Sequence, residues 1–347
     1  MRFHLPALPG QPITKANSTC AFTQKVRKFA DMMVPRGHEV NVYGDPQHDS
    51  LGDHVACYPE TAPPAFSPEA WEEYNRSAAA AIAERAEPGD ILGLIGGICQ
   101  ESLMASLPFM YPVEFGIGYG GSFAPFRIFE SVAWQHTTYG QQRGTNSADG
   151  SFYHAVIPAY FDPDEHPRVK GKGDYLLYIG RLEERKGIMV AEQTAKKLGM
   201  ELIVAGAGPY KPTYGTQVGK VGPEERSKLM SQAVAVMMPT LYIEPFGFVA
   251  VEAQLAGTPA ITTDWGAFTE TVIHNETGFR CHTLGEFCEA VRRAPELDSN
   301  AIRRSAVERY SYGAIAPQYE NYFERLFSLS GPGWYSEAAD TLLGGRI

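Results

Sequence analysis

Cysteine is scarce in this sequence. Its 347 residues include five cysteines, an odd number with no Cys-x-x-Cys pair among them: Cys20, Cys57, Cys99, Cys281 and Cys288. This usage argues against a complete disulfide framework and against a cysteine zinc site, and it favours free thiols in a reducing compartment. We therefore expect a cytoplasmic protein.

Long apolar runs are also missing. The most apolar stretch, DILGLIGGIC at 90–99, is far shorter than the roughly 20 residues that a helix needs to cross a bilayer. The opening MRFHLPALPG lacks the charged-then-apolar pattern of a secretory signal. The sequence therefore predicts no membrane segment.

Positive charge is deficient in the first half of the chain. Residues 1–165 hold 10 Lys and Arg against 19 Asp and Glu, a balance of −9, whereas residues 166–347 hold 20 against 21, a balance of −1. An acidic half disfavours phosphate backbones and anionic lipids as partners without excluding them. The basic stretch QKVRK at 24–28 is interpreted as the solvated face of a helix.

What the sequence does contain is a regular alternation of β-rich runs and amphipathic helical stretches. The length suits one large or two medium domains. We predict strands at 2–8, 37–44, 90–96, 113–119, 174–180, 201–206, 234–239 and 259–263, and helices at 18–33, 67–86, 126–136, 187–199, 223–233 and 247–257. The order indicates an α/β fold of two Rossmann-like domains, each with a parallel sheet, facing across a cleft at the carboxyl ends of the strands.

A proline-, charge- and glycine-rich segment at 157–174 marks the expected boundary. It divides the chain into a domain at 1–160 and a second domain at 161–310. The remaining residues, 311–347, begin with an aromatic-rich helical pattern. Tyr319, Tyr322, Phe323 and Phe327 recur in it at helical spacing and are expected to pack against protein.

The stretch YIGRLEERKG places three cations between a strand and a helix that is expected to begin near Gly187. Arg181, Arg185 and Lys186 are disfavoured at the positive end of a helix dipole unless an anion binds there. The alternative is a hydrated loop in which neighbouring glutamates compensate these charges. Both interpretations stay open on this stretch alone.

The stretch IEPFGFVAVE places Glu244 just before an expected helix and Glu252 inside it. Between the two carboxylates lie the backbone amides of 246–248, and Gly247 allows a ligand to come close to the backbone. A diphosphate flanked by two polyhydroxyl rings fits this layout, because carboxylates accept hydrogen bonds from vicinal hydroxyls. The alternatives are a helix N-cap for Glu244 and an exposed helical acid for Glu252.

Together these stretches resemble the retaining GT-B glycosyltransferases, and most of all glycosyltransferase family 4. The order of YIGRLEERKG, ELIVAGAGP, KVGPEERSKLMSQAVAVMMPTLYIEPFGFVAVEAQLAGTPAITTDWGAFTETV and NETGF carries the resemblance. It includes a glutamate–seven residues–glutamate motif and a close match to a Gly-Arg-x-x-x-x-Lys-Gly motif. The resemblance is strong over about 155–310, and it implies that the C-terminal helix within 311–347 crosses back and packs on the N-terminal domain.

The resemblance implies a nucleotide-sugar donor, for which a UDP-sugar is preferred; the sequence does not choose between UDP, GDP and ADP, nor between the sugars. Arg181 and Lys186, after Gly180, would hold its diphosphate. Glu244 and the amides of Phe246, Gly247 and Phe248 would hold the transferred sugar, and Glu252 the ribose. The remaining motif positions would border the base: Gly206, Gly208, Val221 and Gly222.

The resemblance also implies transfer with retention, in which the leaving phosphate helps to deprotonate the acceptor hydroxyl. Arg181 and Lys186 would stabilise the developing charge, and no metal or other cofactor is expected. The Asp-Pro-Asp at 162–164 is similar to a metal motif of the other glycosyltransferase fold, but a turn is the preferred interpretation.

The first half departs from the family pattern. Tyr119, in EFGIGYGGSF, stands where many members have a histidine beside the reacting sugar, and it is a candidate catalytic residue or a core or rim aromatic. His136 and His154 are further candidates, each interpreted as a core histidine in preference to a catalytic one.

Two other enzyme classes remain as alternatives. A sugar-nucleotide 2-epimerase would share the architecture, and a dinucleotide oxidoreductase is weakly suggested by the partial glycine motif in VAGAGP. For a transferase, a soluble small molecule or saccharide is the preferred acceptor, and modified bases in DNA are the alternative. The sequence does not indicate the oligomeric state.

Overall fold

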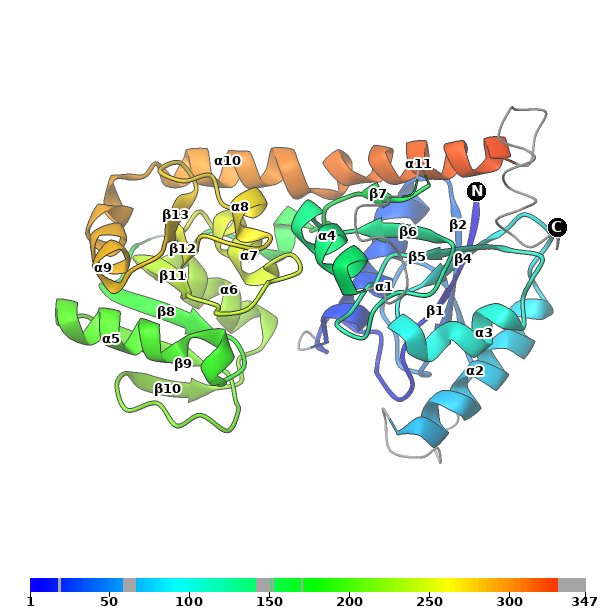
Figure 1. The fold of residues 1–347 in the computed structure, drawn as a ribbon, viewed down its shortest axis with the longest axis horizontal. Coiled ribbons are helices and arrows are strands. Elements are labelled where there is room, and N and C mark those ends of the chain that lie inside the picture. Colours follow the sequence, from blue (N-terminus) through cyan, green and yellow to red (C-terminus); the bar gives the residue numbers. More distant parts are fainter. Residues whose placement is uncertain (18–19, 59–66, 142–150, 152, 170, 330–347) are drawn as a thin grey trace. The chain divides into compact units, whose positions relative to one another are not determined.

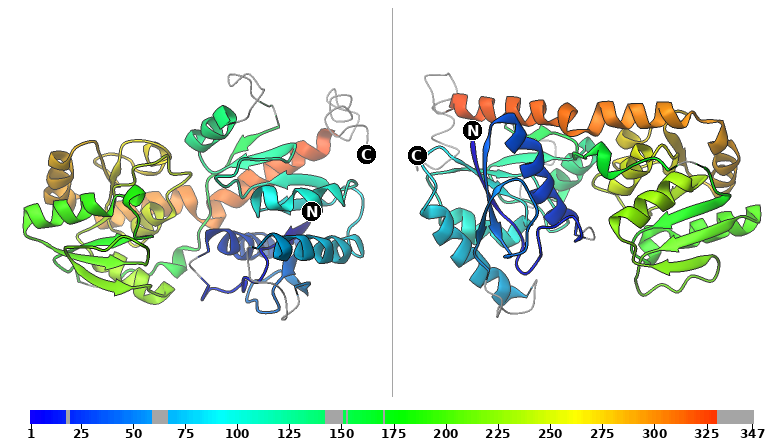
Figure 2. Two further views of the ribbon diagram at one scale, coloured as in Figure 1. Left: turned by 60° about the horizontal axis from the view of Figure 1, so that its bottom comes forward. Right: turned by 180° about the vertical axis from the view of Figure 1, so that it is seen from behind.

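The computed structural model describes residues 1–17, 20–58, 67–141, 151, 153–169 and 171–329. The chain forms two compact units (Figures 1 and 2). Unit 1 contains residues 1–130, 138–160 and the chain from Ile315 onward, and unit 2 contains residues 131–137 and 161–314. Within the described residues, none of the helices combines the length and the apolar character needed to span a membrane.

Unit 1 is built on a parallel sheet. Its strand order over the described residues is β3-β2-β1-β4-β5-β6-β7, and every pairing between neighbours is parallel. The strands are β1 (Arg2–Pro6), β2 (Glu39–Gly44), β3 (Asp53–Ala56), β4 (Ile91–Leu94), β5 (Tyr111–Glu114), β6 (Phe126–Phe129) and β7 (Ala155–Val156). The helices are α1 (Ala21–Met33), α2 (Pro68–Ala83), α3 (Glu101–Ala105), α4 (Val132–Gln141) and α11 (Tyr312–Leu329), of which α4 and α11 each begin in unit 2.

Both faces of this sheet are covered by apolar side chains. On one face, Leu92 and Leu94 of β4 share a buried cluster with Tyr74 of α2. On the other, the ring of Phe3 in β1 lies 5.2 Å from that of Phe29 in α1 and 5.0 Å from that of Phe323 in α11. The predicted aromatic helix near the C-terminus is therefore confirmed, and its buried face completes the core of unit 1.

Unit 2 repeats the arrangement. Its strand order over the described residues is β10-β9-β8-β11-β12-β13, again with parallel pairing throughout. The strands are β8 (Tyr175–Ile179), β9 (Glu201–Ala205), β10 (Thr216–Gly219), β11 (Ala235–Met238), β12 (Ala260–Thr263) and β13 (Gly278–Cys281). The helices are α5 (Ile188–Leu198), α6 (Pro223–Gln232), α7 (Phe248–Leu255), α8 (Phe268–Thr271), α9 (Leu284–Arg293) and α10 (Ser299–Tyr310).

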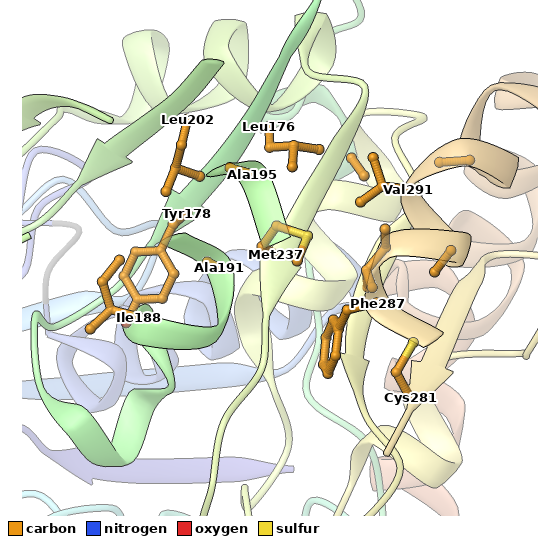
Figure 3. Packing of buried hydrophobic residues seen from close by; sticks show 14 of the residues in the cluster. Leu176, Tyr178, Ile188, Ala191, Ala195, Leu202, Met237, Cys281, Phe287 and Val291 are labelled. Carbon is orange, nitrogen blue, oxygen red and sulfur yellow. The ribbon is translucent and has the colours of Figure 1, made fainter. Parts of the chain in front are cut away.

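Alternate residues of β8 serve opposite faces of this second sheet. Tyr178 packs with Ile188 of α5 in a cluster that also contains Phe287 of α9 (Figure 3). Leu177, one position earlier, packs in a different cluster with Ala253 of α7. Strands that are apolar on both faces belong to parallel sheets covered on both sides. This confirms the predicted fold class of two Rossmann-like α/β domains.

Two predicted elements are wrong in part. The strand expected at 113–119 is β5, which ends at Glu114, so residues 115–119 lie outside it. Residues 126–136 were expected to form a helix, but Phe126–Phe129 forms β6 and the helix begins at Val132. Ser131 lies between the two elements, and its hydroxyl accepts the amide hydrogen of Trp134 at 3.0 Å. An alternating FRIF run followed by a Ser cap is a strand-to-helix junction, which the apolar pattern alone had merged into one helix.

The N-terminus of α2 was predicted correctly and gives a stability test. The Ser67 hydroxyl accepts the amide hydrogen of Ala70 at 3.1 Å, and Pro68 is the first helical residue. Ser67→Ala should lower the free energy of unfolding by about 1 kcal/mol. Ser77→Ala, the same change inside the same helix, should be neutral or slightly stabilising. Urea unfolding monitored by circular dichroism measures both, and equal effects would contradict the capping role.

Candidate functional site

The strand order of unit 2 reverses direction between β8 and β11, which lie side by side in the sheet. In open parallel sheets, the loops that follow two such strands form a binding crevice at their carboxyl ends. Here these loops are 180–187 and 239–247. These two stretches contain six of the twelve candidate donor-binding residues.

Gly187 brings the two loops into backbone contact. Its φ is +73°, and a Cβ atom at this position would lie only 1.8 Å from the Pro239 carbonyl oxygen. The amide of Leu241 donates to the carbonyl oxygen of Arg185 at 2.9 Å, which joins the loops a second time. A side chain at 187 would push the loops apart, so glycine is required by this close approach.

The joined loops pair Lys186 with Glu244. The Lys186 ammonium lies 2.9 Å from Oε2 of Glu244, with the two side chains 20% and 14% exposed. The ammonium also lies 4.9 Å from the ring centroid of Tyr242, and the Arg185 guanidinium lies 4.1 Å from the same centroid. Glu244 is therefore partly accessible and ion-paired, rather than sealed in an apolar interior.

Arg181 is placed differently. Its guanidinium lies 3.0 Å from Glu183, and the side chain is 59% exposed. For Arg181 the structure therefore agrees with the alternative interpretation, a hydrated loop in which a neighbouring glutamate compensates the positive charge. Of the three cations in YIGRLEERKG, Lys186 is the one that the described contacts place on Glu244.

The start of α7 presents unpaired amides. The helix is capped by Gly247, with φ +83° and no side-chain hydrogen bond, so the interpretation of Glu244 as the N-cap is wrong. Among the described residues, no partner accepts the amide hydrogens of Gly247 or Phe248. Phe246 is buried against Phe248 and Tyr310, which fixes this corner. Free amides at a helix N-terminus favour a bound anion or oxygen acceptor.

Glu252 lies inside α7 and is 5% exposed. Its Oε1 lies 3.2 Å from the guanidinium of Arg226, which α6 contributes, while Oε2 has no hydrogen-bond partner within the described part of the chain. The interpretation of Glu252 as an exposed helical acid is therefore wrong. A buried carboxylate with one unsatisfied oxygen is costly in a folded protein unless something binds it.

Both glycines of AGAGP are required because other backbone atoms lie too close for a side chain. A Cβ atom would lie 1.9 Å from the Gly180 carbonyl oxygen at Gly206, and 2.3 Å from that of Leu182 at Gly208. These contacts hold the segment after β9 against the loop after β8. Val221 is half-buried, and Gly222 is the exposed N-cap of α6.

Sequence reasoning missed two residues of this region. Arg226 gave no signal beyond its place in a charged helix, because its partner is 26 positions away in the chain. Glu192 of α5 is 5% exposed, and it accepts hydrogen bonds from the Tyr210 hydroxyl at 2.5 Å and from the Tyr214 amide at 2.8 Å. These hydrogen bonds anchor the segment between β9 and β10. Glu192 belongs to none of the motifs recognised in the sequence, so its role was not predicted.

The remaining candidates lie outside this region. Tyr119 belongs to unit 1, in a turn after β5, and is 53% exposed. His154 is half-buried, its Nδ1 shares a hydrogen bond of 2.6 Å with the Tyr139 hydroxyl, and burial lowers its pKa to about 4, which agrees with a satisfied structural histidine. His136 is exposed on α4, so the interpretation as a core histidine is wrong for it.

The Asp-Pro-Asp segment forms a turn, as expected. Asp162 caps a short 3₁₀ helix (Pro163–Glu165) by accepting the amide hydrogen of Asp164 at 2.9 Å. Within the described ranges, no three His, Cys, Asp or Glu side chains are grouped so that they could hold a metal ion.

Tyr119 follows a strand whose last residue, Glu114, is fully buried. Its Oε2 accepts the amide hydrogens of Phe123 and Ala124 at 3.0 and 3.3 Å, while Oε1 lacks a partner among the described residues. Burial raises the pKa of Glu114 to about 7, although both amides and Arg127 oppose the shift. By accepting these two amide hydrogens, the Glu114 carboxyl ties together the two ends of the loop that carries Tyr119.

The raised pKa predicts a pH dependence of stability. Between about pH 4.5 and 7 the folded protein keeps a proton on Glu114 that the unfolded chain releases, so stability should fall as pH rises through this window. The loss should be roughly 2–3 kcal/mol. Glu114→Gln should remove most of this slope, whereas Glu101→Gln, at an exposed position of α3, should retain it. Urea unfolding from pH 5 to 8 provides the test, and an unchanged slope in Glu114→Gln would contradict it.

Several known proteins are similar to parts of this chain. Residues 163–306 match the family model of glycosyl transferases group 1. The glycogen synthase of Mycobacterium tuberculosis is 34% identical over 153 residues, which cover 39% of this chain and 37% of that protein. The D-inositol 3-phosphate glycosyltransferase of Corynebacterium aurimucosum is 28% identical over 193 residues, covering 47% and 46%. The chain thus spans less than half the length of these curated relatives.

Solved structures resemble the whole chain. A glycosyltransferase involved in avilamycin A biosynthesis, AviGT4, superposes with a TM-score of 0.74 at 21% identity, covering 94% of this chain and 98% of that one. Sucrose-phosphate synthase from Thermosynechococcus elongatus gives 0.72 at 18%, covering 95% and 100%. Anabaena HepE, solved in complex with UDP and glucose, gives 0.67 at 13%, covering 93% and 99%. At these identities the likeness establishes the fold, two Rossmann-like domains with GT-B glycosyltransferases as neighbours.

Proposed function

We propose that this chain, whose residues 163–306 match a glycosyltransferase group 1 domain, moves a sugar from a nucleotide-sugar donor to an acceptor hydroxyl. The donor is a UDP-sugar, the anomeric configuration is retained, as in glycosyltransferase family 4, and no metal takes part. The acceptor is a small molecule or a saccharide, and the reaction occurs in the cytoplasm. The five unpaired thiols support the last assignment.

The observation that carries the proposal is the Lys186–Glu244 pair beside the unpaired amides of α7. A diphosphate brings negative charge to Lys186, and it competes with Glu244 for the ammonium. Glu244 is then available to accept hydrogen bonds from the hydroxyls of the transferred sugar. The amides of Gly247 and Phe248 supply the donors that complete a site for an oxygen-rich ligand.

The other candidate residues extend the donor site. Arg181, exposed on the same loop as Lys186, reaches the diphosphate when it leaves Glu183. Glu252 accepts from the ribose through its unpaired Oε2. The segments at Gly206–Gly208 and Val221–Gly222 border the base, and Tyr119 of unit 1 acts on the acceptor side.

In this proposal the protein stabilises charge instead of forming a covalent intermediate. When the glycosidic bond to the diphosphate breaks, negative charge grows on the leaving oxygen, and the cationic side chains and helix amides are already positioned for it. The departing phosphate accepts the proton of the acceptor hydroxyl on the same face of the sugar. That geometry accounts for retention without a protein nucleophile.

Donor binding tests the proposal directly. UDP-glucose, UDP-N-acetylglucosamine, GDP-mannose and ADP-glucose are screened by thermal shift, and the cognate donor at 100 times its Kd should stabilise the fold by about 2.7 kcal/mol. Slow hydrolysis of that donor should release the α-anomer first, as seen by NMR. A panel without any shift or hydrolysis would overturn the proposal. Accumulation of a 2-epimer of the intact sugar nucleotide would instead support the epimerase alternative.

A further inference from the structure

A cavity in unit 2 is lined mainly by arginine. Its volume of about 310 Å³ lies at the lower end of the range for small-molecule sites. The lining residues come from α10 and from the segment before β8: Arg168, Asn300, Arg303, Arg304, Val307 and Glu308. Three guanidinium groups against one carboxylate leave this lining with a charge of +2.

The cavity lies at the opposite edge of the sheet from the candidate donor site. α7 begins beside the donor loops at Phe248 and ends at Leu255, shortly before β12. Because a helix that connects two parallel strands runs back along the sheet, its C-terminus lies at the amino ends of the strands. There the Arg303 guanidinium donates to the Leu255 carbonyl oxygen, and Nε of Arg168 lies 3.1 Å from where a Cβ would stand at Gly257. The cavity is therefore a separate site.

The arginines of the lining keep hydrogen-bond donors for a ligand. A guanidinium has five N–H groups. Arg303 donates to three backbone carbonyl oxygens, and Arg168 donates to two side chains at the start of α10. Arg304 is 65% exposed, and its guanidinium lies 3.9 Å from the carboxylate of Asp298. The partners of the three arginines thus leave several N–H groups available.

The charges of the lining favour a phosphate. Burial, and then the positive charge of Arg168, lower the pKa of Arg303, so the two guanidinium groups are close enough to repel one another. An anion between them offsets this repulsion. A phosphate monoester carries a charge of about −1.5 to −2 at pH 7 and three acceptor oxygens, which suits a lining of charge +2.

Glu308 indicates that the ligand is more than a phosphate ion. It is exposed, and within the described chain its carboxylate makes no hydrogen bond or ion pair. A carboxylate repels an inorganic phosphate but accepts hydrogen bonds from hydroxyl groups. The half-buried Val307 next to it offers an apolar surface to the carbon atoms of a ring.

We propose that this cavity binds a phosphorylated monosaccharide. The three arginines hold the phosphate, Glu308 accepts hydrogen bonds from the sugar hydroxyls, and the ring packs on Val307. The site uses none of the candidate donor-binding residues, so the inference does not rest on the proposed function.

Calorimetry on the wild-type protein provides the first test, with glucose 6-phosphate, mannose 6-phosphate, fructose 6-phosphate, inorganic phosphate and glucose as probes. At least one hexose phosphate should bind about 5-fold or more tightly than inorganic phosphate, because its hydroxyls add hydrogen bonds to a carboxylate. Glucose should bind about 10-fold or more weakly than that hexose phosphate, since it lacks the charge-assisted bonds to arginine.

Two substitutions at exposed positions assign the binding to the cavity. Arg304→Met should weaken the binding of the hexose phosphate and of inorganic phosphate by about 10-fold each. Glu308→Ala should weaken the hexose phosphate but leave inorganic phosphate unchanged or more tightly bound, because a negative charge is removed. Arg303 is left intact, since its bonds to backbone carbonyl oxygens tie α10 to the end of α7.

Matched substitutions outside the cavity provide the controls. Arg292 and Glu289 form an exposed pair on α9, with side chains 59% and 58% exposed. Arg292→Met and Glu289→Ala should each leave both affinities within about 2-fold of wild type. Lys186→Met, on the donor loop, should also leave them unchanged. Binding that is lost in Lys186→Met would place the hexose phosphate at the donor loops and overturn the inference.

Three further results would overturn it. They are a wild-type protein that binds none of the hexose phosphates, an affinity that Arg304→Met leaves unchanged, and a preference over inorganic phosphate that survives Glu308→Ala. The screen of nucleotide sugars is a separate measurement, so none of these results bears on the proposed sugar transfer.

Discussion

Replacing Glu244 with alanine should lower the rate of sugar transfer by roughly 10²–10³-fold, the size of effect seen when one preorganised electrostatic contact is removed from an active site. Glu244 is the carboxylate that Lys186 holds at the start of α7, with its side chain 14% exposed. Alanine removes the acceptor for the sugar hydroxyls and also leaves Lys186 unrestrained. The turnover number should fall more than the affinity for the nucleotide moiety, since UDP itself does not contact this carboxylate in the proposed site.

A matched substitution makes this result specific. Glu224→Ala removes a carboxylate from an exposed position of α6 in the same unit and should leave transfer within about 2-fold of wild type. Glu224→Ala should unfold within about 1 kcal/mol of wild type, because an exposed carboxylate contributes little to stability. Glu244→Ala should cost more, because it leaves the largely buried Lys186 ammonium without its partner, so circular dichroism first establishes that this variant is folded. Steady-state rates with the cognate donor decide the matter. Unchanged turnover in a folded Glu244→Ala variant would count against the whole assignment of the donor site.

Gly187→Ala should strongly destabilise the fold. The residue has a φ of +73°, and an added Cβ would lie 1.8 Å from the Pro239 carbonyl oxygen, which belongs to backbone and cannot rotate away. Alanine in the left-handed region costs roughly 1 kcal/mol, and the forced separation of two loops adds to it, so we expect a loss of about 3 kcal/mol or more. Activity should fall as well, because the loops carry Lys186 and Glu244.

Gly199 supplies the control for the backbone conformation alone. It caps the other end of α5 with a φ of +65°, and nothing lies within 4 Å of an added Cβ. Gly199→Ala should therefore cost only the left-handed conformation, about 1 kcal/mol. Chemical denaturation of both variants measures the difference. Equal losses would mean that the contact with Pro239 relaxes at little cost.

The sequence was most informative where local chemistry decides structure. The buried apolar run DYLLYIG and the helical patterns at 67–86 and 187–199 predicted their elements correctly, because Ser67 and Gly199 cap these helices locally and strand burial also depends on nearby residues. The merged helix predicted at 126–136 was wrong because nearby residues alone did not decide between a strand and a helix there. A short apolar run suits either a strand or a helix, and the pairing of β6 with β5 and β7 settled it.

The sequence predicted individual residues of the candidate site, but it did not predict which of them contact one another. Lys186 and Glu244 were both candidates, each for a different part of the ligand, and their 58-residue separation concealed that they pair with one another. Arg226 could not be recognised at all, since it becomes significant only when α6 and α7 pack together. Long-range pairing of this kind depends on the order of strands in the sheet, which local patterns do not encode.

The part that α11 plays in unit 1 has a consequence for how the chain is made. Tyr319 packs its ring 5.4 Å from that of Phe29, so α1 has an aromatic partner that is synthesised only after the whole of unit 2. Unit 2, by contrast, is drawn entirely from residues 131–314. On the ribosome unit 2 can thus complete its core before α11 has emerged to cover the sheet of unit 1. A nascent chain halted before Ile315 should accordingly expose the Phe3 and Phe29 surface to chaperones.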